Sequence, residues 1–195
     1  MSDTHIIDIY WEGPFKDFIE VSNYVTTNKR GMSTDYFFYQ IYGEHASYGK
    51  DVLLYIGMSE NGKNVNKEDG IVSRLKKHND NWTGGLCSEI KIYIGSYGYF
   101  RSWSFWHDKR LNPYYKKPLH IDGYPEIPEI ESLLIYAHKP AFNCASIRNI
   151  GAIQSEFHIF NTGRRRSLFP ELSTKYYKNN THEECVVLAA DDVSS

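Results

Sequence analysis

A strand hairpin followed by a helix, spanning residues 36–78, constrains the fold more than any other part of this chain. Residues 36–42, Tyr-Phe-Phe-Tyr-Gln-Ile-Tyr, are aromatic and β-branched and therefore predict a strand. After a turn that contains glycines, residues 52–57, Val-Leu-Leu-Tyr-Ile-Gly, predict a second strand. A loop rich in Asn, Gly and Lys leads to residues 70–78, where the apolar spacing predicts a helix. The expected order is two paired strands and then a helix.

Four side chains in this stretch suit phosphate chemistry. Arg74 and His78 lie four residues apart, so both project from one face of the expected helix. Each strand contributes a tyrosine, Tyr39 from the first and Tyr55 from the second. A guanidinium matches the oxygens of a phosphate, and an imidazole titrates near neutral pH. Together with two phenols, these groups can hold a phosphodiester.

The same residues resemble the signature of the GIY-YIG nuclease family. Residues 37–41, Phe-Phe-Tyr-Gln-Ile, are similar to its first strand, with Phe-Phe in place of Gly-Ile. Residues 55–57, Tyr-Ile-Gly, match the second half of the motif, and residues 74–78 are similar to the Arg-x-x-x-His helix of many members. Farther along, Glu131 opens an apolar helix, and a Pro-x-aromatic-Asn sequence ends at Asn143, which resembles the family's closing signature.

The resemblance, which covers about residues 37–143, implies an α/β (α+β) fold. Its sheet would be small, central and antiparallel, with about three strands flanked by helices. We expect a single domain in which residues 1–34 form a strand–helix extension, 35–145 form the nuclease-like core and 146–195 form a C-terminal extension. The core would hold an insertion at about 97–128.

The resemblance also implies a metal-dependent endonuclease that hydrolyses DNA phosphodiester bonds by a one-metal mechanism. Mg²⁺, or Mn²⁺ in its place, prefers oxygen and keeps several waters, so a single carboxylate can bind it. Glu131 would be the metal ligand, because it is the only acid in the matched set. Arg74 would hold the phosphate, and Tyr39 would take the proton of the attacking water as general base.

The other matched positions complete the implied site. His78 would relay a proton or hydrogen-bond the phosphate, Tyr55 would orient water or phosphate, and Asn143 would brace the site through hydrogen bonds. Gly57 lets the backbone approach closely after the second strand. Met58 stands where some relatives carry a basic residue, which leaves one phosphate contact unfilled.

Two of these assignments have alternatives in the sequence. Side chains alternate along a strand, so Tyr39 and Tyr42 fall on opposite faces. Tyr42 could replace Tyr39 only if the register slipped by one residue, and the continuation Tyr-Gln-Ile favours Tyr39. Glu131 is expected in the first turn of a helix over 128–137, where the helix dipole favours any carboxylate, functional or not.

Two groups of basic residues are candidate nucleic-acid contacts, since such residues meet phosphates. They are a pair on the expected helix and a run near the C-terminus: Lys76, Lys77, Arg164, Arg165 and Arg166. Surface arginines are equally compatible with simple solvation. Residues 97–128, rich in aromatic and basic side chains, are either a lid packed on the core or a further contact.

Elsewhere the patterns predict short elements. Residues 6–12 predict a strand, and Pro14 is placed to begin a helix. Residues 88–95 alternate clearly and predict a third strand, and 157–160 a further short one. A helix is expected over about 170–177.

Charge and cysteine content limit the kinds of partner and the cellular compartment that we expect for this protein. The formal net charge is −2, so no global field attracts nucleic acid, and binding would depend on local patches. The three cysteines are odd in number and far apart, which favours a reducing compartment. No signal-peptide pattern or membrane-length apolar run is present in the sequence. We therefore expect a soluble cytoplasmic protein whose partner is nucleic acid, foremost double-stranded DNA, and not a membrane.

The leading functional hypothesis is a DNA endonuclease. The first alternative is a related nuclease acting in repair or on RNA, which the motif does not distinguish. The second is a module on a nuclease scaffold that binds nucleic acid without cutting it.

Overall fold

The computed structural model describes residues 4–27, 36–59, 70–85, 89–99, 125–148, 150 and 153–179. The strands are β1 (His5–Phe15), β2 (Tyr36–His45), β3 (Gly49–Met58), β4 (Lys91–Tyr99), β5 (Phe157–Gly163) and β6 (Glu171–Ser173). The helices are α1 (Phe18–Thr27), α2 (Ile71–Asn81), α4 (Ile127–His138) and α5 (Thr174–Asn179), with a short 3₁₀ helix, η1, at Thr83–Gly85.

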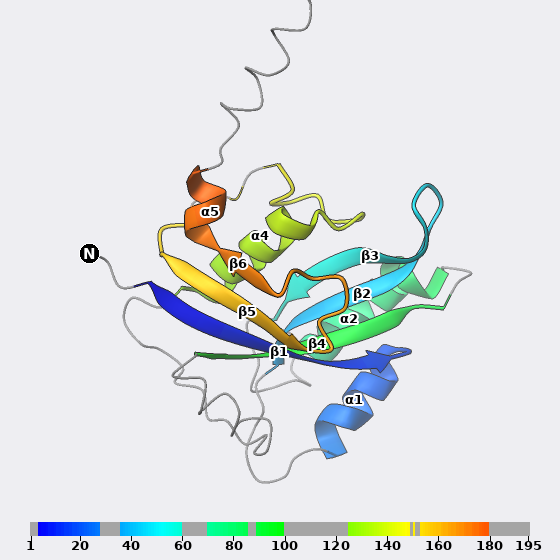
Figure 1. Ribbon diagram of the computed structural model, residues 1–195. Helices are drawn as coiled ribbons and strands as arrows, with labels where there is room; N and C mark the ends of the chain where they lie inside the picture. The colour runs from blue at the N-terminus through cyan, green and yellow to red at the C-terminus, as the bar shows by residue number, and fades with distance from the viewer. Residues whose placement is uncertain are drawn as a thin grey trace, which may run out of the picture.

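The six strands form one mixed sheet in the order β3-β2-β4-β1-β5-β6 (Figure 1). β1 and β5 pair in parallel, and the other neighbouring strands pair antiparallel. The fold is therefore α+β, but the prediction of an antiparallel sheet of about three strands is wrong. The three expected strands correspond to β2, β3 and β4. The free edge of β4 is then paired by β1, and β5 and β6 extend the sheet, so both expected extensions contribute strands to it.

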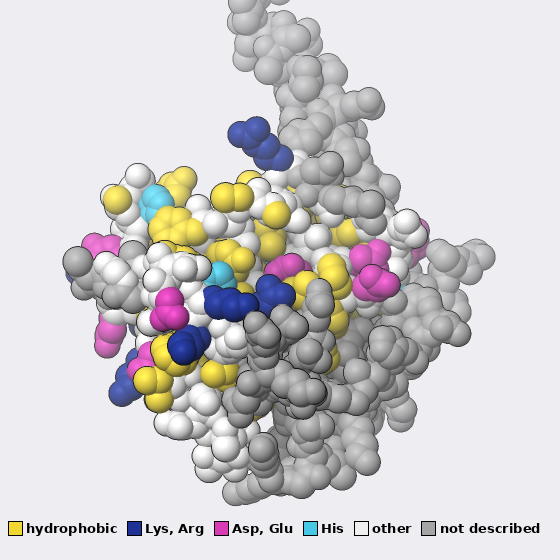
Figure 2. Space-filling model, turned by 180° about the vertical axis from the view of Figure 1, so that it is seen from behind, with side chains coloured by type: hydrophobic (Ala, Val, Ile, Leu, Met, Phe, Trp, Pro, Cys, Tyr) yellow, Lys and Arg dark blue, Asp and Glu magenta, His cyan; other side chains and the backbone are white. Residues whose placement is uncertain are grey.

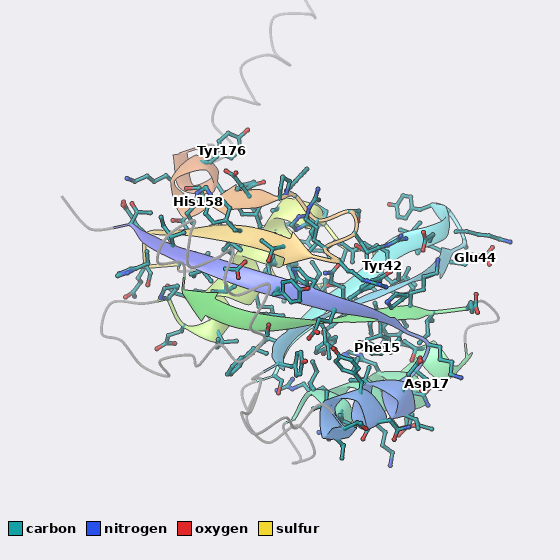
Figure 3. All side chains as sticks on the ribbon, turned by 60° about the horizontal axis from the view of Figure 1, so that its bottom comes forward. Phe15, Asp17, Tyr42, Glu44, His158 and Tyr176 are labelled. Carbon is teal, nitrogen blue, oxygen red and sulfur yellow. The ribbon has the colours of Figure 1, made fainter. Side chains whose placement is uncertain are left out.

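The helices cover the two faces of the sheet separately. On one face α1 and α2 enclose a core cluster, and on the other α4 packs on a second, larger one (Figure 1). Phe15, at the end of β1, lies against α1, where its ring centroid is 4.9 Å from that of Tyr24 (Figure 3). None of the described helices has the length and apolar character needed to cross a bilayer.

Helix α4 begins one residue earlier than expected. Glu126 and Glu129 form a capping box, in which each side chain hydrogen-bonds the other residue's backbone N–H. The helix ends at His138, and its C-cap residue, Lys139, has a left-handed φ of 48°. Because the capping box fixes the start at Ile127, Glu131 lies in the second turn rather than the first. Its position therefore is not explained by capping.

Two sequence predictions fail at proline positions. Pro14 does not begin a helix, because β1 runs to Phe15 through a bulge at residues 13 and 14, and α1 starts at Phe18. Residues 170–177 are not one helix, because 171–173 pair with β5 as β6 and the helix starts only at Thr174. Of the expected insertion at 97–128, residues 100–124 lie outside the described part of the chain.

Candidate functional site

Tyr39 occupies a space on the sheet that a glycine leaves open. In the β2–β3 pairing Tyr39 lies directly opposite Gly57. A Cβ atom on Gly57 would lie 2.3 Å from Cζ and 2.4 Å from Oη of Tyr39, so the tyrosine ring covers the glycine. The Tyr39 side chain is only 1% exposed. Gly57 is therefore required here for the ring opposite it, which the sequence alone does not show.

Helix α2 presents His78 to this ring. The Nε2 atom of His78 lies 2.8 Å from Oη of Tyr39, within hydrogen-bond distance. The rings of Tyr39 and Tyr55 are nearly parallel, with centroids 6.1 Å apart, and the Tyr55 ring lies 4.5 Å from that of His78. The structure thus brings both strand tyrosines and the helix histidine together.

Glu131 reaches the same place from the other layer of the molecule. Its carboxyl group accepts a hydrogen bond from the backbone N–H of Met58, at the end of the edge strand β3. Glu131 raises and Arg74 lowers the pKa of both Tyr39 and Tyr55, so both charged groups lie within electrostatic range of the two tyrosines. Figure 2 shows histidine, basic and acidic side chains among hydrophobic ones over α2 and α4.

Burial shifts the pKa values of Glu131, His78, Tyr39 and Tyr55. The pKa of Glu131 rises to about 7 through burial, against the opposing effects of the Met58 hydrogen bond and Arg74. Burial, assisted by Arg74, lowers the pKa of His78 to about 4. Burial also raises the pKa of Tyr39 well above its usual value, with Tyr55 and Glu131 adding to the rise. At pH 7 His78 and Tyr39 are therefore both neutral.

The donor set fits one hard cation bound through a single carboxylate. In the described part of the chain no three His, Cys, Asp or Glu side chains gather as a metal site. Glu131 is a half-buried carboxylate whose pKa is raised by burial, and a cation bound beside it would favour its ionised form. Mg²⁺ accepts this arrangement, because it fills its remaining positions with waters and substrate oxygens.

Asn143 holds the edge of β3. Its Oδ1 atom accepts a hydrogen bond of 2.9 Å from the backbone N–H of Ile56, and its Nδ2 donates one of 2.9 Å to the Ile56 carbonyl. The preceding residues, Ala141 and Phe142, also donate backbone hydrogen bonds to β3. Asn143 thus fixes the strand segment between Tyr55 and Gly57.

Tyr42 lies in the opposite core cluster from Tyr39. Its hydroxyl donates to Oε1 of Gln40 at 2.9 Å and lies 2.9 Å from Oγ of Ser167. Its contacts are thus made on the far side of β2 from His78.

The basic residues divide into two groups. Lys76 and Lys77 are exposed on α2, the helix that carries Arg74 and His78. Each arginine of the 164–166 run hydrogen-bonds within the protein. The acceptors are the Gly13 carbonyl at 2.6 Å for Arg164, the Leu168 carbonyl for Arg165 and the Asp51 carboxylate for Arg166.

Trp82 is a site neighbour that sequence analysis missed. Its indole Nε1 donates a hydrogen bond of 3.0 Å to Nδ1 of His78, on the opposite side of the imidazole from Tyr39. The available signal was its spacing, because Arg74, His78 and Trp82 recur every four residues along one helix face.

Comparison of the chain with family models, with curated proteins and with solved structures finds no match in any of the three. The resemblance to GIY-YIG nucleases therefore depends on the motif residues of the sequence alone.

Proposed function

We propose that the chain is a metal-dependent endonuclease of GIY-YIG type that hydrolyses DNA phosphodiester bonds. The observation that supports this proposal is the gathering of five matched side chains from two strands and two helices: Tyr39, Tyr55, Arg74, His78 and Glu131. Tyr39 is buried and the other four are half-buried, and polar groups gathered in this way are a common feature of active sites.

Arg74 is the phosphate-holding group of this proposal. Its guanidinium stays charged at all physiological pH values and offers a planar fork of N–H donors. It lies near enough to Tyr39 and Tyr55 to act on their pKa values. A phosphate held there would sit beside both phenols.

Tyr39 takes the proton of the attacking water in this proposal. A divalent cation held by Glu131 would supply a polarised water and offset the negative charge that develops on the phosphate. Because burial raises the pKa of Tyr39, its phenol is protonated near neutral pH and cannot by itself accept a proton. Nearby positive charge must favour the ionised form before Tyr39 can act as a base. The charge of Arg74 acts in that direction. Tyr55 orients the water or the phosphate.

The experiment is nicking of supercoiled plasmid with Mg²⁺ by the full chain and by Glu131→Gln and Arg74→Ala. Matched controls are Glu171→Gln and Lys175→Ala, which change exposed residues of β6 and α5. The wild type and the controls should nick the plasmid, and chelation should stop it. Each site variant should lose about 10²–10³-fold in rate, the usual effect of removing one transition-state contact.

The outcomes separate the functional hypotheses. DNA retention without cutting in either Mg²⁺ or Mn²⁺ would favour a binding module. Preferential cutting of an RNA duplex offered in parallel would shift the substrate to RNA. Full activity in Glu131→Gln would contradict the role of this carboxylate.

A further inference from the structure

The hydrogen bonds of His78 determine which of its two nitrogens carries the proton. Trp82 is the C-cap residue of α2, and its backbone N–H bonds the His78 carbonyl at 2.9 Å. Its side chain lies against the same histidine, with indole Nε1 at 3.0 Å from Nδ1 and the ring centroids 5.7 Å apart. Trp82 therefore contacts His78 through both its backbone and its indole.

An indole N–H can only donate a hydrogen bond. Nδ1 of His78 must then present its lone pair to Trp82, so it carries no proton. A neutral imidazole has one N–H, which is left on Nε2, the atom 2.8 Å from Oη of Tyr39. The imidazolium is disfavoured as well, because its second N–H would point at the indole N–H.

We infer that Trp82 is a positioning residue that holds His78 in the Nε2–H tautomer, so that His78 donates its hydrogen bond to the hydroxyl oxygen of Tyr39. The three groups form a one-way chain, from the Trp82 indole to the imidazole and from the imidazole to the phenol. Two independent distances carry this inference, and neither depends on the reaction.

This chain of hydrogen bonds from Trp82 through His78 to Tyr39 restricts what His78 can do for Tyr39. Since Nε2 already carries a proton, it cannot accept one from the phenol, and a relay from Tyr39 to His78 is closed. The bond from Nε2–H instead stabilises negative charge on Oη, because a donor to the ionised form favours that form. Before Tyr39 can act as a base, its hydroxyl proton must pass to solvent water, because His78 does not accept it. This consequence for catalysis rests on the proposed function, whereas the tautomer does not.

The direct test is long-range ¹H–¹⁵N correlation NMR of the imidazole rings in the full chain. The chain has eight histidines, so the signals of His78 are assigned by their loss in His78→Gln. The wild type should show an unprotonated Nδ1 and a protonated Nε2. A protonated Nδ1 in the wild type would overturn the inference, whatever the variants do.

Trp82→Phe keeps an aromatic ring and removes the N–H donor, so it should release the tautomer and give a mixed or Nδ1–H form. Trp11→Phe is the matched control, because Trp11 also donates an indole hydrogen bond, at 3.0 Å to Oδ1 of Asn161, but lies elsewhere in the core. The control should leave the His78 signals unchanged. If folded Trp82→Phe kept the same His78 tautomer, another group would be holding that tautomer, and the role of Trp82 would be overturned.

Kinetics of plasmid nicking test the catalytic consequence. Trp82→Phe should lower kcat by about 10–100-fold with KM changed less than about twofold, because losing the donor to Oη disfavours the ionised phenol that the reaction step uses. An unchanged kcat together with a released tautomer would refute the catalytic consequence. Absence of nicking by every form, with the expected tautomer, would reject the proposed function and leave the positioning role intact.

Discussion

Replacing Gly57 with alanine tests whether the Tyr39 ring lies directly over Gly57 on the sheet. The new Cβ would lie 2.3 Å from Cζ of Tyr39, where carbon atoms normally approach to about 3.5 Å, so the ring must move by about 1.2 Å. The backbone of Gly57 needs no left-handed φ, so the alanine adds a clash and no backbone strain. Any effect therefore reports the position of the ring.

The displacement has two calculable consequences. Overpacking a buried position costs about 1–3 kcal/mol of unfolding free energy. A shift of about 1.2 Å also takes Oη out of hydrogen-bond range of His78, now 2.8 Å away, and misplacement of about 1 Å costs roughly 10²-fold in rate. Urea unfolding followed by circular dichroism measures the first consequence, and plasmid nicking the second.

The control is Gly85→Ala, because a Cβ there meets no atom within 4 Å. It should change neither stability nor rate appreciably. A double-mutant cycle sharpens the test, since Tyr39→Leu removes the clashing atoms. Gly57→Ala should then cost at least about 1 kcal/mol less in the Tyr39→Leu background than in the wild type. Equal costs in both backgrounds would refute the proposed ring position.

Three further predictions concern other parts of the molecule. Burial lowers the pKa of His138 to about 4, whereas the unfolded chain binds that proton near pH 6.5. The resulting stability is present above pH 6.5 and is lost as pH falls toward 4, by about 3 kcal/mol. Urea unfolding across this range should show that pH dependence reduced in His138→Gln, and an equal dependence would contradict it. Asn143→Ala leaves both backbone groups of Ile56 without their partners, and should destabilise the chain by about 1–3 kcal/mol and slow nicking. Wild-type stability would show that Asn143 does not hold this edge. Alanine at positions 164–166 should weaken DNA binding in fluorescence anisotropy and flatten its salt dependence by about one slope unit per lost phosphate contact. An unchanged slope would remove these arginines from the interface.

The local elements were largely predictable, because their signals lie within short windows. The hairpin of β2 and β3, helix α2 and helix α4 follow directly from residue type and apolar spacing. The strand character of residues 6–12 was also visible, but its place in the middle of the sheet was not. β1 pairs with β4 and β5, which are distant in sequence, and a local pattern does not specify such partners.

For the candidate site, too, the residues could be predicted from local sequence but their contacts could not. Motif spacing singled out Tyr39, Arg74 and His78 as candidate site residues, but the pairing of Tyr39 with Gly57 depends on a register that passes two irregularities in the hairpin. Trp82 lies on the face already assigned to Arg74 and His78, yet nothing in its spacing shows that its indole turns toward Nδ1. Atomic contacts of this kind depend on side-chain orientation, which residue order does not fix.

The most direct test of the proposed active site is the metal-dependent nicking rate of Tyr39→Phe under single-turnover conditions. This change keeps the ring that covers Gly57 and removes only the hydroxyl that faces His78. We predict a folded variant whose Mg²⁺-dependent rate is lower than that of the wild type by about 10²-fold or more. Cleavage by Tyr39→Phe at the wild-type rate and with the same metal requirement would contradict the proposed chemistry.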